Sequence, residues 1–336
     1  MTRKQLRESL APFSKKSYCI PLAHLTLDAA FWLASLALAL LAEPLAAKLL
    51  GSILMAIATS RLFIIGHDAC HQSLTPSRPL NRLIGRLCFL PSLTPYSLWE
   101  VGHNVAHHGY HNLRGHDYVW VPLSTEQYAA LPAWRRALEK YYRSGIGFGL
   151  YYLIELWWKR LYFPSRQLVA VRRTIFVLDN LLVSTFALTQ AGIIAWIAPH
   201  VAVNILAALA FCIGLPFLLW VGCIGFVTYC QHTHPSISWY ASKADWTNEK
   251  AFISATAHTH FKLPIGGLLH WIFEHPVHHV DMLIPFYRLR AAQVAFHNAV
   301  GGMSRVVHLT WADYWRNAHA CGLYDFESGR WLKFPG

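Results

Sequence analysis

The sequence predicts an all-α integral membrane protein with four transmembrane helices in two hairpins and a cytoplasmic helical cap. Three observations lead to this prediction. Hydrophobic residues make up 54% of the 336 residues and charged residues only 14%, which is too little charge to cover a soluble protein of this length. Several apolar runs are long enough to span a bilayer. Clusters of histidine follow these runs, and they indicate that the cap holds a histidine-rich site for two metal ions.

The predicted transmembrane segments fall into two pairs, and each pair has only a very short connection. Glu43-Pro44 separates the first two segments, and Pro199-His200 separates the last two, so each pair is expected to form a helical hairpin. We expect one domain over residues 1–336. The predicted spans are approximately residues 21–42, 45–65, 174–198 and 201–229.

The distribution of Lys and Arg predicts the orientation in the membrane. The two short connections carry almost no positive charge, whereas residues 1–17, the middle segment and the C-terminal third carry nearly all of it. By the positive-inside rule, both termini and all histidine clusters should lie in the cytoplasm, with residues 1–17 as a retained cytoplasmic arm. The formal net charge of +12 favours contact with anionic lipid or an acidic partner protein. No segment has the basic density typical of nucleic-acid binding.

Two further segments are expected at the membrane interface. The apolar stretch 83–98 is interrupted by Pro91 and Pro95 and is too short to cross, so it should be interfacial or re-entrant. Residues 114–173 interleave Tyr and Trp with Arg and Lys, as amphipathic helices in the headgroup layer do. The seven cysteines form no CxxC pair and are expected to be unpaired.

Histidine is concentrated in four places. The segment 102–112, GHNVAHHGYHN, alone contains four, and smaller clusters lie in GHDACHQS (66–73), QHTHP (231–235) and EHPVHHV (274–280). Neutral imidazole is the commonest protein ligand for a transition metal and titrates near neutrality, so metal or proton chemistry is indicated. A single histidine is usually a surface or capping residue, but several clusters at the ends of membrane helices favour a common metal site.

Helix geometry predicts how the histidines are presented. Residues at i and i+4 lie on one face of an α-helix, about 6 Å apart along the axis. His67 and His71 have this spacing, and so do His275 and His279. The segment 103–111 could present His103, His107 and His111 as one stripe. Three such helices facing a common centre could hold two metal ions.

These motifs resemble the three histidine boxes of the membrane fatty acid desaturase superfamily. HDACH is an HxxxH box, GHNVAHH an HxxxHH box and HPVHH an HxxHH box. The stretches TYCQHTHPSISWY and HPVHHVDMLIPFY resemble the C-terminal half of acyl-lipid desaturases of the Δ12/ω-3 type, and the resemblance covers roughly residues 62–289. One difference is Thr228, since related enzymes have Asn four residues before an additional ligand that corresponds to His232.

The resemblance implies a non-haem di-iron centre that activates dioxygen and oxidises an acyl C–H bond. In the second box the resemblance favours His103, His107 and His108 as ligands over the stripe that ends at His111, because adjacent imidazoles can serve different irons. The roles of His111 and His234 stay open. Asp68 and Glu274 are candidates for orienting the ligand rings. The implied iron ligands are His67, His71, His103, His107, His108, His232, His275, His278 and His279.

The implied substrate is a fatty acid or a fatty acyl lipid. The sequence has no Rossmann fingerprint, cysteine cluster or haem motif, so a separate ferredoxin or cytochrome b5-like protein should supply electrons. Desaturation is the first prediction. Hydroxylation and oxidative decarboxylation to a 1-alkene use the same centre, and a histidine-rich metal transporter or sensor is a remote alternative. Segments 91–99 and 239–252 are expected either to line a substrate tunnel or to form only an interfacial aromatic belt.

Overall fold

The computed structural model describes residues 2–164, 173–246, 256–261, 265–301, 306–308 and 310–335. In these ranges the chain is mostly helical, with two short two-stranded sheets. Two compact units can be distinguished by their internal packing. The first unit comprises Met1–Lys15, Val101–Tyr152 and Gly225–Gly336, and the second comprises Lys16–Glu100 and Leu153–Ile224. The prediction of one domain over the whole chain stays a prediction.

Four helices in the described part of the chain are long and apolar enough to cross a membrane. They are Cys19–Leu41, Leu45–Cys70, Thr174–His200 and the continuous helix Ile205–His232. Each matches one predicted span, so the prediction of four such helices is confirmed. Large apolar side chains on these helices point outward: Leu188 is 75% exposed and Leu206 is 76% exposed. Such exposure suits a helix surrounded by lipid.

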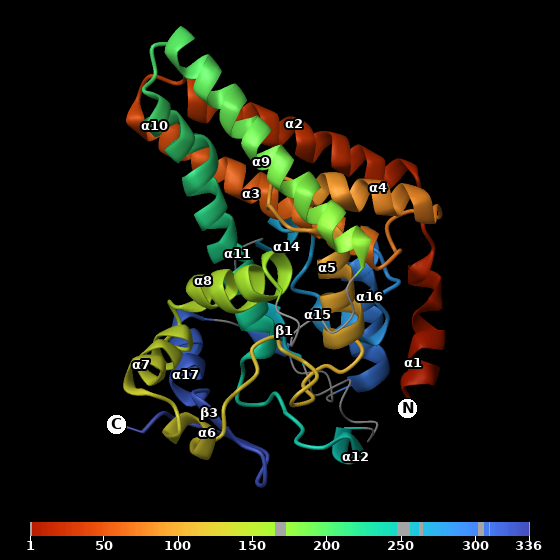
Figure 1. Ribbon diagram of the computed structural model, residues 1–336. Helices are drawn as coiled ribbons and strands as arrows, with labels where there is room; N and C mark the ends of the chain where they lie inside the picture. The colour runs from red at the N-terminus through yellow and green to blue at the C-terminus, as the bar shows by residue number, and fades with distance from the viewer. Residues whose placement is uncertain are drawn as a thin grey trace. The chain divides into compact units, whose positions relative to one another are not determined.

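The second unit contains most of these long helices (Figure 1). Its helix α11 continues into the first unit, and η3 begins there. The elements are α2 (Cys19–Leu41), α3 (Leu45–Cys70), α4 (Arg78–Phe89), α5 (Tyr96–Glu100), η3 (Tyr152–Tyr162), α9 (Thr174–His200), α10 (Ile205–Leu209), η4 (Ala210–Gly214) and α11 (Leu215–His232).

Helices α2 and α3 pack side by side along their length (Figure 1). Gly51 permits this close approach, because a Cβ atom there would lie 2.5 Å from the backbone nitrogen of Ala39. Two polar contacts fix the register of the pair. The Trp32 indole donates to Thr59 Oγ1 at 3.1 Å, and the Arg61 guanidinium donates to the buried carboxylate of Asp28 at 2.6 Å. The end of α3 carries the first histidine pair, so this packing positions it.

The stretch predicted to be interfacial or re-entrant forms two short helices, α4 and α5. Ser77 caps α4 by accepting from the backbone N–H of Leu80, and the chain turns through residues 90–95 before α5 begins. Asp179 on α9 holds both helices, since it accepts from the Arg86 guanidinium at 2.8 Å and from the Ser97 backbone N–H at 2.9 Å. The position of the stretch 83–98 at the membrane interface stays a prediction.

The first unit combines short helices with the two small sheets. Strand β1 pairs in parallel with β2, with His258 opposite Val306, and β3 pairs antiparallel with β4, with Leu323 opposite Leu332. Its elements are α1 (Arg3–Leu10), η1 (Ala11–Ser14), η2 (Val101–His107), α6 (Thr125–Ala129), α7 (Ala133–Tyr142), α8 (Phe148–Tyr151), α12 (Lys243–Trp246), β1 (His258–His260), α14 (Ile265–Leu268), α15 (His275–Val280), α16 (Phe286–Val300), β2 (Val306–His308), α17 (Trp311–Ala320), β3 (Leu323–Asp325) and β4 (Arg330–Leu332).

A buried aromatic cluster stabilises the middle of the first unit. Trp120 is fully buried and stacks on Tyr151 with ring centroids 3.9 Å apart. Arg143 donates to the carbonyl oxygens of Trp120 and Val121 at 3.0 and 2.7 Å, so the loop after the second histidine box is held from two sides. The segment 114–173 does form short helices, as predicted, although residues 165–172 lie outside the described residues. None of the seven cysteines, all of which lie within the described residues, forms a disulfide.

Candidate metal centre

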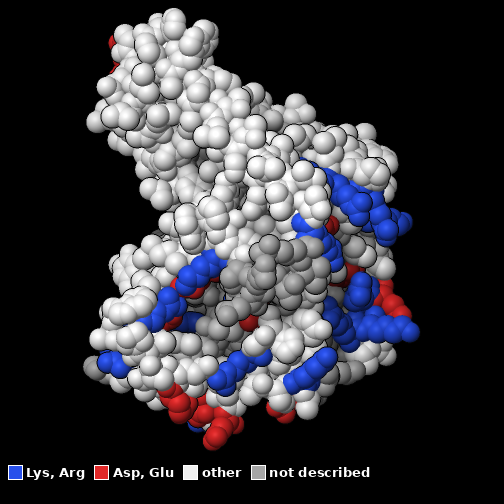
Figure 2. Space-filling model, in the orientation of Figure 1, with Lys and Arg blue, Asp and Glu red and all other residues white. Residues whose placement is uncertain are grey.

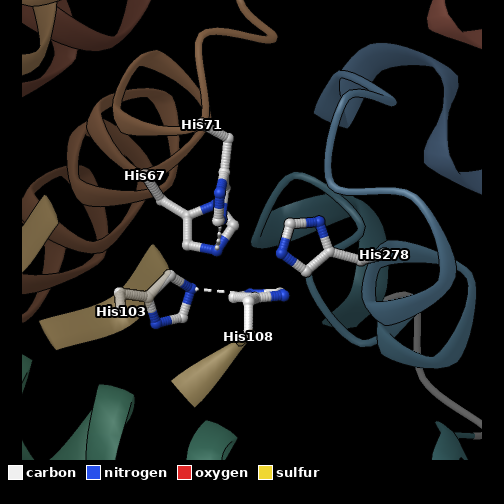
Figure 3. Close-up of side chains that lie close together, drawn as sticks. All are labelled: His67, His71, His103, His108 and His278. Carbon is white, nitrogen blue, oxygen red and sulfur yellow. Dashed lines mark hydrogen bonds between the residues drawn. The ribbon is translucent and has the colours of Figure 1, made fainter. Parts of the chain in front are cut away.

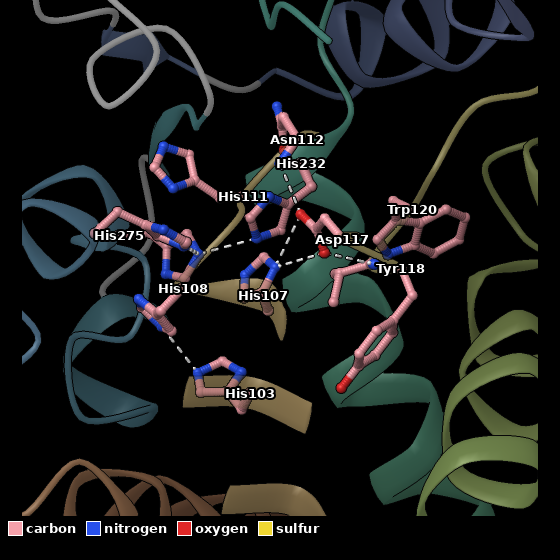
Figure 4. Close-up of polar contacts among 12 residues, drawn as sticks. His103, His107, His108, His111, Asn112, Asp117, Tyr118, Trp120, His232 and His275 are labelled. Atoms are coloured by element: carbon pink, nitrogen blue, oxygen red, sulfur yellow. Dashed lines mark hydrogen bonds and ion pairs between the residues drawn. The ribbon is translucent and has the colours of Figure 1, made fainter. Parts of the chain in front are cut away.

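Four imidazoles of the first unit converge in a buried cluster. Each of His107, His232, His275 and His279 is at most 3% exposed, and each offers a ring nitrogen within 4.8 Å of the other three. Nε2 of His275 lies 3.0 Å from Nε2 of His232 and 2.8 Å from Nε2 of His279. Figure 4 shows His107, His232 and His275 directed toward this cluster. We call these residues the four-histidine cluster.

Local structure explains why these side chains meet. His275 and His279 are four residues apart in α15, where Pro276 occupies the first turn, so both rings lie on one face as predicted. His232 is the last residue of α11. The neighbouring Gln231 amide donates to the carbonyl oxygen of Ile272 at 2.7 Å, which ties the end of α11 to the segment leading into α15.

The second histidine box forms a π-helix rather than the α-helix that the sequence suggested. In η2 the backbone N–H of His108 donates to the carbonyl oxygen of His103 at 2.8 Å, which is an i to i+5 bond. The wider turn places His108 over His103, with their Nε2 atoms 3.0 Å apart (Figure 3). His107 instead joins the four-histidine cluster. The expected face shared by His103 and His107 is therefore wrong in detail, because it assumed 3.6 residues per turn.

Adjacent histidines in two boxes face different groups. His103, His108 and His278 of the first unit offer ring nitrogens within 4.8 Å of one another, whereas His107 and His279 belong to the four-histidine cluster. His278 and His279 are consecutive, as are His107 and His108. Neighbouring imidazoles therefore belong to different groups of ring nitrogens, and their assignment to different metal ions stays a prediction.

The first histidine box lies in the last turn of α3, within the second unit. Nε2 of His71 is 3.3 Å from Nε2 of His67, and both rings are buried. Asp68 accepts from Nδ1 of His67 at 3.0 Å, as the sequence suggested. Trp99 packs against this pair, with its ring centroid 5.3 Å from that of His67 and 6.3 Å from that of His71. Figure 3 shows the two rings.

A carboxylate that sequence reasoning missed orients His107. Both oxygens of the buried Asp117 lie near Nδ1 of His107, at 3.0 and 3.1 Å. The backbone N–H groups of Asn112 and Val119 also donate to this carboxylate, so it is held in place before it contacts the imidazole (Figure 4). The only sign of this contact in the sequence is that an acidic residue follows the box histidine by ten positions, directly after Gly-His.

The other residues singled out from the sequence have different surroundings. Glu274 pairs with His258 at 2.5 Å. Nδ1 of His234 lies 2.6 Å from the Ser236 hydroxyl. His111 is buried and its ring is 5.4 Å from that of His279, outside the four-histidine cluster. Thr228 accepts from the Trp120 indole at 3.1 Å, which helps to hold the loop after the second histidine box.

The chemistry of the donor set fits a divalent transition metal. The four-histidine cluster supplies ring nitrogens as donors. Burial, followed by the neighbouring rings of His275 and His107, lowers the pKa of His279 well below its ordinary value. A neutral imidazole has a lone pair available for a metal, and Asp117 fixes which nitrogen of His107 faces the cluster.

Four helices able to span a membrane and a buried imidazole cluster define a helical membrane protein with a candidate metal site built from histidine. The family model described as fatty acid desaturase matches residues 43–311. The chain belongs to the fatty acid desaturase family, which confirms the resemblance drawn from the histidine boxes.

Three cyanobacterial desaturases illustrate the relationship. The sn-1 acyl-lipid omega-3 desaturase (ferredoxin) of Nostoc is 27% identical over 270 residues, covering 77% of this chain and 70% of that protein. The sn-1 oleoyl-lipid 12-desaturase of Picosynechococcus is 28% identical over 268 residues, covering 79% and 73%. The omega-3 enzyme of Synechocystis is 30% identical over 284 residues, covering 82% and 74%. Desaturases are oxidoreductases, so the prediction of an enzyme of this class is confirmed.

Proposed function

We propose that the protein introduces a C=C bond into the acyl chain of a membrane lipid, in a reaction that consumes dioxygen. The observation that carries this proposal is the four-histidine cluster, whose ring nitrogens lie within 4.8 Å of one another in a member of the desaturase family. The names of the relatives favour an acyl lipid over a free acid and desaturation over hydroxylation or decarboxylation.

Two iron ions are the proposed cofactor. His107, His232, His275 and His279 would hold one ion, and the family resemblance implies the other histidines of the boxes as further iron ligands. When bound, such a pair of irons supplies the activation of dioxygen. Overall, the acyl chain loses two hydrogen atoms, and dioxygen combines with these, two electrons and two protons to give two molecules of water.

The chain's own residues orient the ligands and exclude water. The Asp117 carboxylate accepts from Nδ1 of His107, which leaves Nε2 free to face the cluster. The Asp68 carboxylate accepts from Nδ1 of His67, whose Nε2 lies 3.3 Å from Nε2 of His71. Burial of all four rings of the cluster keeps bulk water away, and it lowers the pKa of His279. Trp99, packed on His67 and His71, is the proposed wall that positions an acyl chain.

The two electrons would come from a separate carrier, because the sequence contains no redox motif of its own. We propose an acidic ferredoxin or a cytochrome b5-like protein. The name of the Nostoc relative includes ferredoxin, and the net charge of +12 favours an acidic partner. We further propose that both termini and the metal centre face the cytoplasm, where such carriers are found.

Expression in a bacterial host that lacks polyunsaturated acyl chains, together with a ferredoxin and its reductase, would test the reaction. Gas chromatography with mass spectrometry of the lipids should reveal an acyl chain with a new double bond. The matched control is His107→Ala, which should give no product. A hydroxy acid or a volatile 1-alkene in place of the new double bond would contradict desaturation.

A further inference from the structure

Helix α4 has one buried face and one exposed apolar face. Its buried residues pack toward α3, where a Cβ atom on Gly66 would lie 2.5 Å from the ring of Phe89. On the other side, Leu83 is 55% exposed and Leu87 is 52% exposed. Two leucines exposed at i and i+4 form a continuous apolar strip that the described part of the chain leaves uncovered.

A basic edge runs beside this strip. Arg78, Arg82 and Arg86 recur every four residues, and the helix sequence RPLNRLIGRLCF contains no acidic residue. Arg86 is engaged, since it donates to Asp179 and its guanidinium lies 4.8 Å from the centroid of the Tyr96 ring. Arg78 and Arg82 are exposed. Figure 2 shows basic side chains gathered where Figure 1 places α4.

The contacts within the second unit place α4 beside the end of a spanning helix. Asp179, which binds Arg86, lies in the second turn of α9. Large apolar side chains that follow on α9 face outward, with Leu181 57% exposed and Leu188 75% exposed. In Figure 2 the surface over most of α9 is white, and basic side chains appear beside its lower end. Since α9 is long and apolar enough to span, α4 lies beside the point where its apolar surface begins.

We infer that α4 lies in the membrane interface, with Leu83 and Leu87 in the acyl region and Arg78 and Arg82 bound to the phosphates of anionic lipid headgroups. An apolar strip flanked by arginines is the composition of interfacial helices that bind anionic lipid. Arginine also forms paired hydrogen bonds with phosphate oxygens. This inference rests on the second unit alone and does not depend on the proposed reaction.

Binding of short-chain phosphatidylglycerol and phosphatidylcholine to the purified full-length protein in uncharged detergent tests the inference, with calorimetry as the readout. The wild-type protein should bind phosphatidylglycerol more tightly than phosphatidylcholine. Each basic residue near a lipid surface contributes roughly a fivefold change in affinity, so Arg78→Gln with Arg82→Gln should weaken phosphatidylglycerol binding by roughly 25-fold. The matched control is Arg330→Gln with Lys333→Gln, which removes two exposed charges from the first unit.

A second pair of substitutions tests the apolar strip. Leu83→Asn with Leu87→Asn should weaken the binding of both lipids by similar factors, because those side chains contact acyl chains and not headgroups. The inference would be overturned if the Arg78→Gln, Arg82→Gln variant and the Arg330→Gln, Lys333→Gln control lost affinity for phosphatidylglycerol equally. Competition by inorganic phosphate at the same concentration as the lipid would also overturn it, since the site would then recognise free phosphate rather than a lipid surface.

Discussion

The carboxylate of Asp117 and the imidazole of His107 form a buried pair, with both oxygens 3.0 and 3.1 Å from Nδ1. The same carboxylate accepts two backbone N–H groups, from Asn112 and Val119. Its position is therefore fixed by the loop that follows the π-helix, and the ring of His107 is fixed in turn. Carboxylates in this arrangement set the tautomer of a metal ligand and raise its basicity.

Asp117→Asn should weaken iron binding by about 10- to 100-fold, because the amide cannot supply the negative charge and can present an N–H to Nδ1. Iron retained by the purified protein during titration with a chelator would measure the loss. Asp245→Asn is the matched control, since Asp245 is exposed and contacts only Ser242 among the hydrogen bonds described for it. Equal iron retention in both variants would show that Asp117 does not act on the metal.

Metal analysis of the purified protein should find two iron ions per chain. Nine histidines in the boxes and at the end of α11 are more than one ion can coordinate, and they divide between different groups of neighbours. Removal of iron with a chelator should abolish product formation, and ferrous iron should restore it. A protein that contains a single zinc ion and retains full turnover would contradict the di-iron proposal.

Alanine substitutions of His71, His107 and His278, one from each box, should each abolish product formation. Each removes an imidazole from a buried group while leaving the apolar faces of the spanning helices unchanged. Membrane fractionation should find the variants at wild-type levels. His200→Ala is the control, because His200 is exposed at the end of α9. Near-normal turnover in two of the three variants would show that the ligand assignment is wrong.

The spanning helices and the histidine boxes could be predicted because their signals are local. Each apolar run is continuous in the sequence, and the i, i+4 spacing of His275 and His279 describes their helix correctly. The π-helix at Val101–His107 could not be predicted, since its extra residue per turn changes which histidines stack and leaves no compositional trace. Asp117 was missed because its approach to His107 depends on the turn at residues 112–117. Glu274, the other carboxylate suggested by its place next to a box, pairs with His258.

The last prediction concerns the position attacked on the substrate. Trp99 is 6% exposed and lies edge-on to both His67 and His71, so its ring limits the space beside the first histidine pair. Tyr96 is also buried, and a Cβ atom on Gly85 would lie 2.2 Å from its ring. Helix α4 therefore packs closely against Tyr96. The other predicted wall, 239–252, extends beyond the described residues after position 246.

Trp99→Phe should shift the chain length preferred or the bond desaturated, because a smaller ring moves the limit of the space while keeping it apolar. The milder substitution is chosen since truncation of a buried Trp to Ala typically costs about 3–5 kcal/mol of stability. The double-bond position in the products, measured by mass spectrometry, is the readout, and iron content should stay at the wild-type level. Trp134→Phe is the control, because Trp134 is 68% exposed on α7. If activity falls only in proportion to protein level and the products are unchanged, Trp99 belongs to an interfacial belt and not to a substrate tunnel.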